Sequence, residues 1–354
     1  MPVGGQDVSE ILVRIGDQEV SVARGAAVGT VLLEAGVVPA DELLAAIVDS
    51  RCVDLDFPLP AATEIRPVTY AVREGVLAYR RTASLVLLEA ARRLWGDGVH
   101  VSIGQALSNG YVYEICREGE DGFSAEAFSA LEAEMRRVVE EDISLRRELV
   151  SLTEAKRRFA GKGHINRHRL LKSYWGSQIE LVYCGEFCDI HHYPVAPRTG
   201  FVSAFELDHR PPDEVLLRFP TRQHPHEVPP FHDSPKLRQV YTETRRWLRL
   251  LDVATVGQLN ELTIGGQVGE LIRIAEGLHE KKVAQIADQI CRPDHAVRLV
   301  AVAGPSASGK TTFSKRLSLQ LKVNGVHPVA LSTDNFYIDR VDTPLDDAGN
   351  YDFE

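Results

Sequence analysis

The chain has 354 residues, of which 44% are hydrophobic and 25% are charged, and its formal net charge is -10. Since most domains run to about 100 to 200 residues, this length predicts more than one folded domain. The composition excludes a disordered or fibrous chain. The negative charge argues against strong non-specific binding to nucleic acid, although a local basic face could still exist.

The N-terminus and the cysteines indicate an intracellular protein. The opening residues, MPVGGQDVSE, lack the basic start and apolar run of a secretion signal, and no apolar stretch is long enough to cross a bilayer. The five cysteines are scattered, which is typical of reduced thiols rather than of a disulfide framework. We therefore expect a cytoplasmic protein without membrane contact.

The first 70 residues predict a small sheet crossed by one helix. Apolar and polar residues alternate over 11–22 on both sides of Gly16-Asp17, a pair suited to the tight turn of a hairpin. A short helix closed by Gly36 should follow. Further strands are expected at 45–48 and 64–68, which together predict a β-grasp-like module.

The middle region predicts an α+β arrangement. Apolar residues at helical spacing predict a helix over 80–95, and Ser124 is placed to cap a second helix. That second helix should bury Phe128, Leu131, Met135 and Val138. Four runs are typical of strands: 100–107, 110–116, 179–187 and 200–207. The proline-rich stretch 210–235 predicts an extended surface connection.

The last third predicts helices and then the start of an α/β domain. Two helices should follow residue 235, and the second should end before Pro293. The apolar run 297–304 is typical of a buried parallel strand. A helix over 311–323 and a further strand over 327–333 should come next.

Residues 304–311, GPSASGKT, match the phosphate-binding loop pattern at every defined position. Glycines let successive N–H groups curl around an anion, and the N-terminus of the following helix adds positive potential. Lys310 would reach the β- and γ-phosphates, and the Thr311 hydroxyl would ligate Mg²⁺. We therefore expect ATP and Mg²⁺ to bind, in contact with Gly304, Pro305, Ser306, Ala307, Ser308, Gly309, Lys310, Thr311 and Thr312.

Asp334 lies just past the predicted strand 327–333, where ligands bind in open α/β sheets. A carboxylate there can take a proton from an attacking hydroxyl, which is the general-base role in a small-molecule kinase. It can equally cap a turn or belong to the Mg²⁺ shell. The residue pattern alone leaves these alternatives open.

The segments GPSASGKTTFSKRL, LSTDNFYIDR and TPLDDAGNYDFE resemble the start of the uridine kinase and phosphoribulokinase family. The closest likeness is to the long bacterial nucleoside kinases with a threonyl-tRNA-synthetase-like N-terminal half. The resemblance implies ATP-dependent, Mg²⁺-dependent phosphorylation of the 5′-hydroxyl of a nucleoside such as uridine or cytidine. It also implies that Lys310 is catalytic, Asp334 is the base, Tyr337 lines the nucleoside pocket and Asp352 holds the ribose hydroxyls.

The N-terminal half resembles threonyl-tRNA synthetase, with 11–70 similar to its TGS module and 73–207 similar to its editing domain. Where that editing domain has an H-x-x-x-H pair, this chain has Arg81 and Leu85. The later Cys and His positions hold His191 and Val195. An arginine and two aliphatic side chains cannot bind a metal or activate water, so we expect no hydrolytic editing of mischarged tRNA.

The resulting domain prediction has an α+β N-terminal half followed by the start of an α/β P-loop kinase domain. A P-loop domain of ordinary size needs about a hundred residues more than follow the loop here, so we expect an incomplete, inactive kinase domain. The oligomeric state is left open. The predicted domains are 1–72, TGS-like; 73–209, editing-like; 210–292, extended and helical connector; and 293–354, the N-terminal part of the kinase domain.

Two alternatives remain open at this point. The chain could be a nucleotide-sensing regulatory protein that binds tRNA or another RNA through its synthetase-like half. It could also be a P-loop kinase for an acceptor other than a nucleoside. Contact with RNA is the minority interpretation, because the basic pairs on predicted helices sit among acidic residues and are typical of solvated faces.

Cys184 and Cys188 lie near His191 and His192, which raises the question of a metal site. The C-x₃-C spacing is not the usual zinc spacing, and residues four apart on a strand share a face and pack. The sequence therefore favours packing over metal binding for this cluster.

Overall fold

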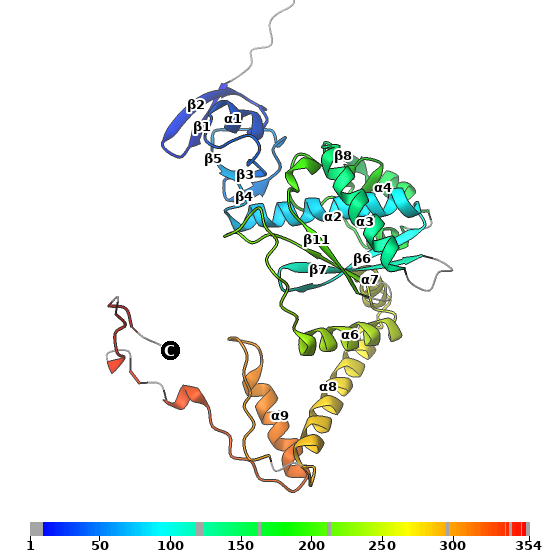
Figure 1. Cartoon of the computed structure of the whole chain (residues 1–354), viewed down its shortest axis with the longest axis vertical. Helices are drawn as coiled ribbons and strands as arrows, with labels where there is room; N and C mark the ends of the chain where they lie inside the picture. Colours follow the sequence, from blue (N-terminus) through cyan, green and yellow to red (C-terminus); the bar gives the residue numbers. More distant parts are fainter. Residues whose placement is uncertain are drawn as a thin grey trace, which may run out of the picture. The chain divides into compact units, whose positions relative to one another are not determined.

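The computed structural model describes residues 10–117, 123–161, 164–210, 214–294, 297–336, 338–339, 342–347 and 349–351. The chain divides into two compact units, Met1–Glu261 and Leu262–Glu354, and each is described here by itself. Figure 1 labels the helices and strands of both. Within the described residues, no helix is long and apolar enough to cross a membrane.

The first unit begins with a five-stranded mixed sheet in the order β2-β1-β5-β3-β4. β1 is antiparallel to β2 and parallel to β5, and the single helix α1 packs its buried face on the sheet. The sequence predicted the hairpin, the helix and two of the remaining strands, but missed the short β4. The bounds are β1 Glu10–Ile15, β2 Gln18–Ala23, α1 Val28–Glu34, β3 Ala45–Val48, β4 Arg51–Val53 and β5 Thr63–Val68.

The alternation of β1 explains this small core. Ile11, Val13 and Ile15 are buried while the residues between them are exposed, which is the period of a strand with one face on a core. Gly16 turns the chain into β2 at a positive φ of 58°, a conformation that glycine adopts without strain.

A four-stranded antiparallel sheet in the order β11-β12-β7-β6 lies under two helices, α2 and α3. α2 begins at Arg73, earlier than predicted, because Ala78 and Tyr79 join the buried face. α3 starts at its Ser124 cap as predicted, with the Ser124 hydroxyl accepting a bond from the Ala127 N–H. The bounds are α2 Arg73–Trp95, β6 Val99–Leu107, β7 Gly110–Arg117, α3 Ala125–Glu140, β11 Glu206–Arg210 and β12 Glu214–Arg218.

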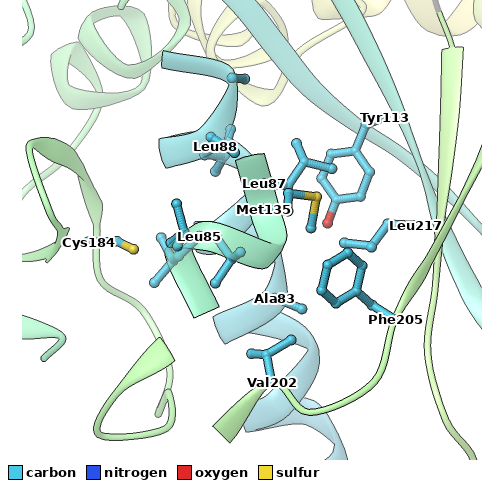
Figure 2. Packing of buried hydrophobic residues seen from close by; sticks show 14 of the residues in the cluster. Ala83, Leu85, Leu87, Leu88, Tyr113, Met135, Cys184, Val202, Phe205 and Leu217 are labelled. Carbon is cyan, nitrogen blue, oxygen red and sulfur yellow. The ribbon is translucent and has the colours of Figure 1, made fainter. Parts of the chain in front are cut away.

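The core between this sheet and its helices is the largest of the unit. Leu87 from α2 and Met135 from α3 meet Tyr113 and Leu217 from the two central strands (Figure 2). The four α3 residues predicted to be buried are all buried. The structure therefore confirms the α+β arrangement of this region.

A three-stranded sheet in the order β10-β9-β8 carries two short helices, α4 and α5. Its core joins Val150, Ala155, Phe159, Leu171 and Ile179. Two longer helices, α6 and α7, come after β12 in the chain. The bounds are β8 Arg146–Ser151, α4 Leu152–Arg158, α5 Ile165–Lys172, β9 Gln178–Cys184, β10 Phe187–Ile190, η1 Thr199–Phe201, α6 Pro235–Leu250 and α7 Val256–Ile264.

Three predictions in this unit were wrong. The strand expected at 200–207 begins as the short helix η1 and irregular backbone, and β11 starts only at Glu206. The single strand expected at 179–187 is a hairpin, because Gly185 adopts a positive φ of 58° and turns β9 back into β10. The surface connection expected at 210–235 contains β12, a central strand. Its run EVLLR is apolar enough to be buried between β11 and β7. This strand was missed because the many neighbouring prolines indicated an irregular connection.

The second unit consists of α8 Val268–Ile290 packed on α9 Lys310–Val323, followed by the short η2 Thr333–Phe336. Val283 and Ala287 of α8 meet Leu317 and Leu321 of α9 in a small core. α8 ends before Pro293, as predicted, but it is the third helix after residue 234, since α6 and α7 precede it where one helix was expected. The apolar side of α8 is only partly covered, since Ile272 and Ile286 are exposed.

The two strands predicted on either side of α9 are absent from the described structure. Residues 297–304 and 327–333 carry no strand pairing, and Leu299 and Val329 are each 84% exposed. A parallel pair is stable only when both of its faces are covered. In the described part of this unit, α8 and α9 are the long elements available to cover a sheet, and they pack on each other. The apolar character of 297–304 and 327–333 was therefore not enough to predict strands.

Candidate functional site

The loop before α9 has the curl that anion binding requires. Ala307 and Gly309 have positive φ values of 58° and 87°, and the Ser308 N–H bonds the Pro305 carbonyl at 3.3 Å. A Cβ added at Gly304 would meet the Ser308 Oγ at 2.7 Å, so this position suits a residue without a side chain. The loop and the helix predicted from the sequence are therefore formed.

Lys310 is folded over this loop. Its Nζ donates to the carbonyls of Gly304 at 2.7 Å and Pro305 at 2.8 Å. No acidic residue lies in the first turn of α9, so the cation and the helix N-terminus add their positive potentials. Thr311 and Thr312 are exposed beside it. These residues fit a phosphate chain, with Thr311 as the hydroxyl available to Mg²⁺.

Of the other residues predicted for this site, the structure describes only Asp334, which has no hydrogen bond to the loop within the described part of the chain. Asp334 lies exposed in η2, where its N–H bonds the Ser332 hydroxyl at 3.3 Å. Among the described residues, no hydrogen bond or ion pair joins Asp334 to Lys310. Tyr337 and Asp352 fall outside the described residues.

The four positions that the resemblance to an editing domain singled out, Arg81, Leu85, His191 and Val195, are held by packing and hydrogen bonds in the first unit. Leu85 and Val195 belong to the main core, where Figure 2 labels Leu85. Arg81 donates to the Pro194 carbonyl at 3.1 Å, and its guanidinium lies 4.8 Å from the centre of the Tyr193 ring. Burial lowers the pKa of Arg81 from its ordinary value.

His191 is tied to a carboxylate that the sequence did not single out. Its Nε2 lies 2.9 Å from the Oδ2 of Asp54, and its side chain is 5% exposed. Asp54 also accepts from Arg147 at 2.6 Å and from the Val195 N–H at 3.0 Å. With these three partners the carboxylate of Asp54 is a structural link.

The same contacts set the charge of Asp54. Burial acts to raise its pKa, but the hydrogen bond from His191, the charge of Arg147 and the bond from Val195 outweigh burial. The pKa of Asp54 therefore lies below its ordinary value. An ionised, fully partnered carboxylate beside an arginine has no capacity to activate water. The expected lack of editing chemistry agrees with this geometry.

The two cysteines of the cysteine and histidine cluster lie in different cores. Cys184 ends β9 inside the main core, whereas Cys188 lies in β10 against the smaller core of α4 and α5. Within the described residues, no group of three or more His, Cys, Asp or Glu side chains is arranged to hold a metal ion. Both cysteines pack, as predicted, but they do so in two different cores and not on one strand face, because the chain turns at Gly185 between them.

Two features were not predicted from the sequence: the role of Asp54 and the basic residues of α4 and α5. Asp54 carries no local signal, because only the fold brings it to His191 and Arg147. The concentration of basic residues over α4 and α5 was visible in the sequence, as KRR at 156–158 and RHRLLK at 167–172, and was overlooked.

Comparison with known proteins gives one consistent result. No family model matches the chain. The threonine–tRNA ligase of Carboxydothermus hydrogenoformans is 32% identical over 169 residues, or 48% of this chain and 26% of that protein. Threonine–tRNA ligase 2 of Bacillus subtilis is 34% identical over 161 residues, 45% of this chain and 25% of that protein. The enzyme of Nitratidesulfovibrio vulgaris strain DP4 is 31% identical over 197 residues, 55% and 30% respectively.

The chain thus spans between 25% and 30% of the length of these relatives. They confirm the resemblance to threonyl-tRNA synthetase over about half of the chain. They also overturn the kinase prediction, because the relatives are named as ligases for tRNA. The expected ATP-dependent phosphorylation of a nucleoside, and with it the enzyme class of nucleoside kinase, is wrong. The uridine kinase and phosphoribulokinase resemblance finds no support in these comparisons.

Proposed function

We propose that this chain is a nucleotide-responsive tRNA-binding protein. Residues 10–261 contact tRNA, and the loop at 304–312 binds a nucleoside triphosphate with Mg²⁺. The observation that carries the proposal is the likeness of about half the chain to threonine–tRNA ligases, proteins named for their action on tRNA. Binding of tRNA, the minority interpretation from the sequence, thereby becomes the favoured one.

In this proposal the synthetase-like half keeps the architecture of a tRNA-binding region without its hydrolytic chemistry. The sheet of residues 10–68 corresponds to the TGS-like domain, 1–72, and the region of α2 and α3 to the editing-like domain, 73–209. The connector, 210–292, and the domain from 293 onward follow. Arg81, Leu85 and Val195 cannot act as metal ligands, and the Nε2 of His191 is hydrogen-bonded to Asp54. An aminoacyl ester on a bound tRNA therefore stays intact.

The nucleotide would bind at the N-terminus of α9. The N–H groups of the curled loop face the phosphates, and Lys310 exchanges its bonds with the carbonyls of Gly304 and Pro305 for bonds to phosphate oxygens. Thr311 would ligate Mg²⁺, which offsets the charge of the phosphates when bound. The loop then acts as a sensor, and the readout is a change in tRNA affinity.

The test is direct titration of a fluorescently labelled tRNA with the full chain, followed by anisotropy at several salt concentrations, with and without ATP and Mg²⁺. We expect saturable binding that weakens as salt increases, since phosphate contacts release counterions. We also expect the affinity to change when ATP and Mg²⁺ are added. Absence of saturable binding at low salt contradicts the proposal. An affinity indifferent to nucleotide removes the sensing part and leaves tRNA binding in place.

A further inference from the structure

Helices α4 and α5 concentrate positive charge in a chain that is acidic as a whole. The described residues 152–161 and 164–175 contain six Lys or Arg and one acidic residue, against a net charge of -10 for the chain. We call this the α4–α5 surface. It is defined by Lys156, Arg157, Arg158, Arg167, Arg169, Lys172, Tyr174 and Trp175.

The carboxylates near the α4–α5 surface do not neutralise it, because most are shared. Glu154 pairs with both Arg157 and Arg158. Glu261 lies 3.0 Å from Lys172 and 3.6 Å from Arg169. Glu148 also pairs with Arg158, and Asp189 pairs with Arg167. Within the described residues, four carboxylates therefore face the six cations, and an excess of positive charge remains. Arg157 and Lys172 are also well exposed, at 75% and 53% of their side chains.

An exposed aromatic pair follows α5 directly. Trp175 is 97% exposed and Tyr174 is 40% exposed. Gly176 permits this arrangement, since a Cβ there would meet the Tyr174 ring at 2.6 Å. An almost fully exposed tryptophan that directly follows a helix rich in arginine and lysine has the composition of a stacking platform for unpaired nucleic-acid bases.

The surface borders a recess with the same chemistry. A cavity of about 190 Å³ is lined by Phe159, Tyr183 and Phe187 together with Arg158, His164 and Arg167. Aromatic faces and guanidinium groups thus occur together around it. Burial, helped by the charge of Arg167, lowers the pKa of His164, so this side chain adds no charge at neutral pH.

A lipid surface fits these residues less well. Leu171 is buried and Leu170 packs against the core of Val150 and Ala155, so Ile165 is the one exposed aliphatic residue among the described residues of α5, too little for insertion into a bilayer. Four of the six cations are arginines, whose planar fork suits phosphate oxygens and stacks on bases. We propose that the α4–α5 surface binds a single-stranded stretch of RNA, with an unpaired base stacked on Trp175. The inference rests on the proposed function for the identity of its partner.

The experiment uses the full chain and a 5′-labelled oligoadenylate of 12 nucleotides. We expect saturable binding with quenching of tryptophan fluorescence. Replacing Trp175 by Ala should weaken binding about tenfold and abolish most of the quenching, while W175F should recover part of the affinity but not the signal. Lys172→Ala should reduce the slope of log affinity against log salt by about 0.7. Lys236→Ala, at an exposed lysine of α6, should leave both unchanged.

Three results would overturn the inference: no binding of the oligoadenylate, equal affinity of wild type and W175A, or tighter binding to vesicles containing phosphatidylserine than to RNA. Because Trp175 is almost fully exposed, W175A should fold normally, which the unfolding midpoint checks. The outcomes separate the two proposals. Retention of tRNA binding by W175A leaves the proposed function standing and removes this surface. Binding of the oligoadenylate without binding of tRNA would leave this surface standing and remove the proposed function.

Discussion

The carboxylate of Asp54 lies 2.9 Å from Nε2 of His191, and so joins the end of the first sheet to the position where the resembled editing domain has its later cysteine. The residue that could have remained a ligand is thereby used for structure. Arg147 and the Val195 N–H complete the link from the other side.

Asp54→Asn should lower the free energy of unfolding by about 2 kcal/mol, because it removes the charge that Arg147 and His191 share, while Arg147 keeps Asp56 as a second charge partner. Urea unfolding followed by circular dichroism measures this. Glu42→Gln, at an exposed carboxylate of the same region, is the matched control and should change stability little. Equal midpoints for the two variants would show that the link is not stabilising.

The contribution of Asp54 should depend on pH in one direction. Its pKa is lower in the folded chain than the value of about 4 typical of an unfolded one. The stabilisation is therefore fully present above about pH 4 and is lost as pH falls through the lower, folded value. The stability difference between wild type and Asp54→Asn should stay constant from pH 7 to 5 and shrink below pH 4. A difference that grows on acidification contradicts this assignment.

Gly185→Ala should destabilise the β9–β10 hairpin more than an ordinary glycine substitution at positive φ. The new Cβ would lie 2.6 Å from Oε1 of Glu89, a buried carboxylate that also accepts from the Phe187 N–H. Gly16→Ala is the control, since Gly16 has the same φ of 58° and open space around it. We expect a loss of about 1 kcal/mol for the control and a clearly larger loss at Gly185. Equal losses would mean that Glu89 moves aside without cost.

Lys310→Ala should weaken the binding of ATP with Mg²⁺ by about tenfold or more, the loss expected for a charged hydrogen-bond donor to phosphate. Titration calorimetry measures the affinity. Lys322→Ala is the control. It removes the same charge from an exposed lysine near the other end of α9, away from the loop, and leaves the helix intact. Equal affinities for the two variants would place the nucleotide elsewhere.

Local patterns in the sequence were enough to predict the elements that local interactions stabilise. The alternation of Ile11, Val13 and Ile15 predicted β1, the Ser124 cap predicted the start of α3, and the glycine-rich loop predicted its own curl. These features depend on residues within a few positions of one another.

The rest depended on partners far away in the chain. β12 is buried only because β7 and β11 flank it, while 297–304 is equally apolar and has no flanking strand within the described residues. The residue types at Arg81 and Leu85 could be read from the sequence. The use of His191 by Asp54 could not, because it is created by the fold.

The central claim, that the chain binds tRNA but does not act on its ester, is tested most directly by one measurement on a single mixture. An aminoacylated tRNA is incubated with a saturating amount of the full chain, and the half-life of the ester is compared with that of the tRNA alone, while anisotropy reports the bound fraction. We predict a tRNA that is fully bound and an ester that lives at least as long as in buffer. A bound tRNA whose ester is released faster, or a tRNA that stays unbound, would contradict the account.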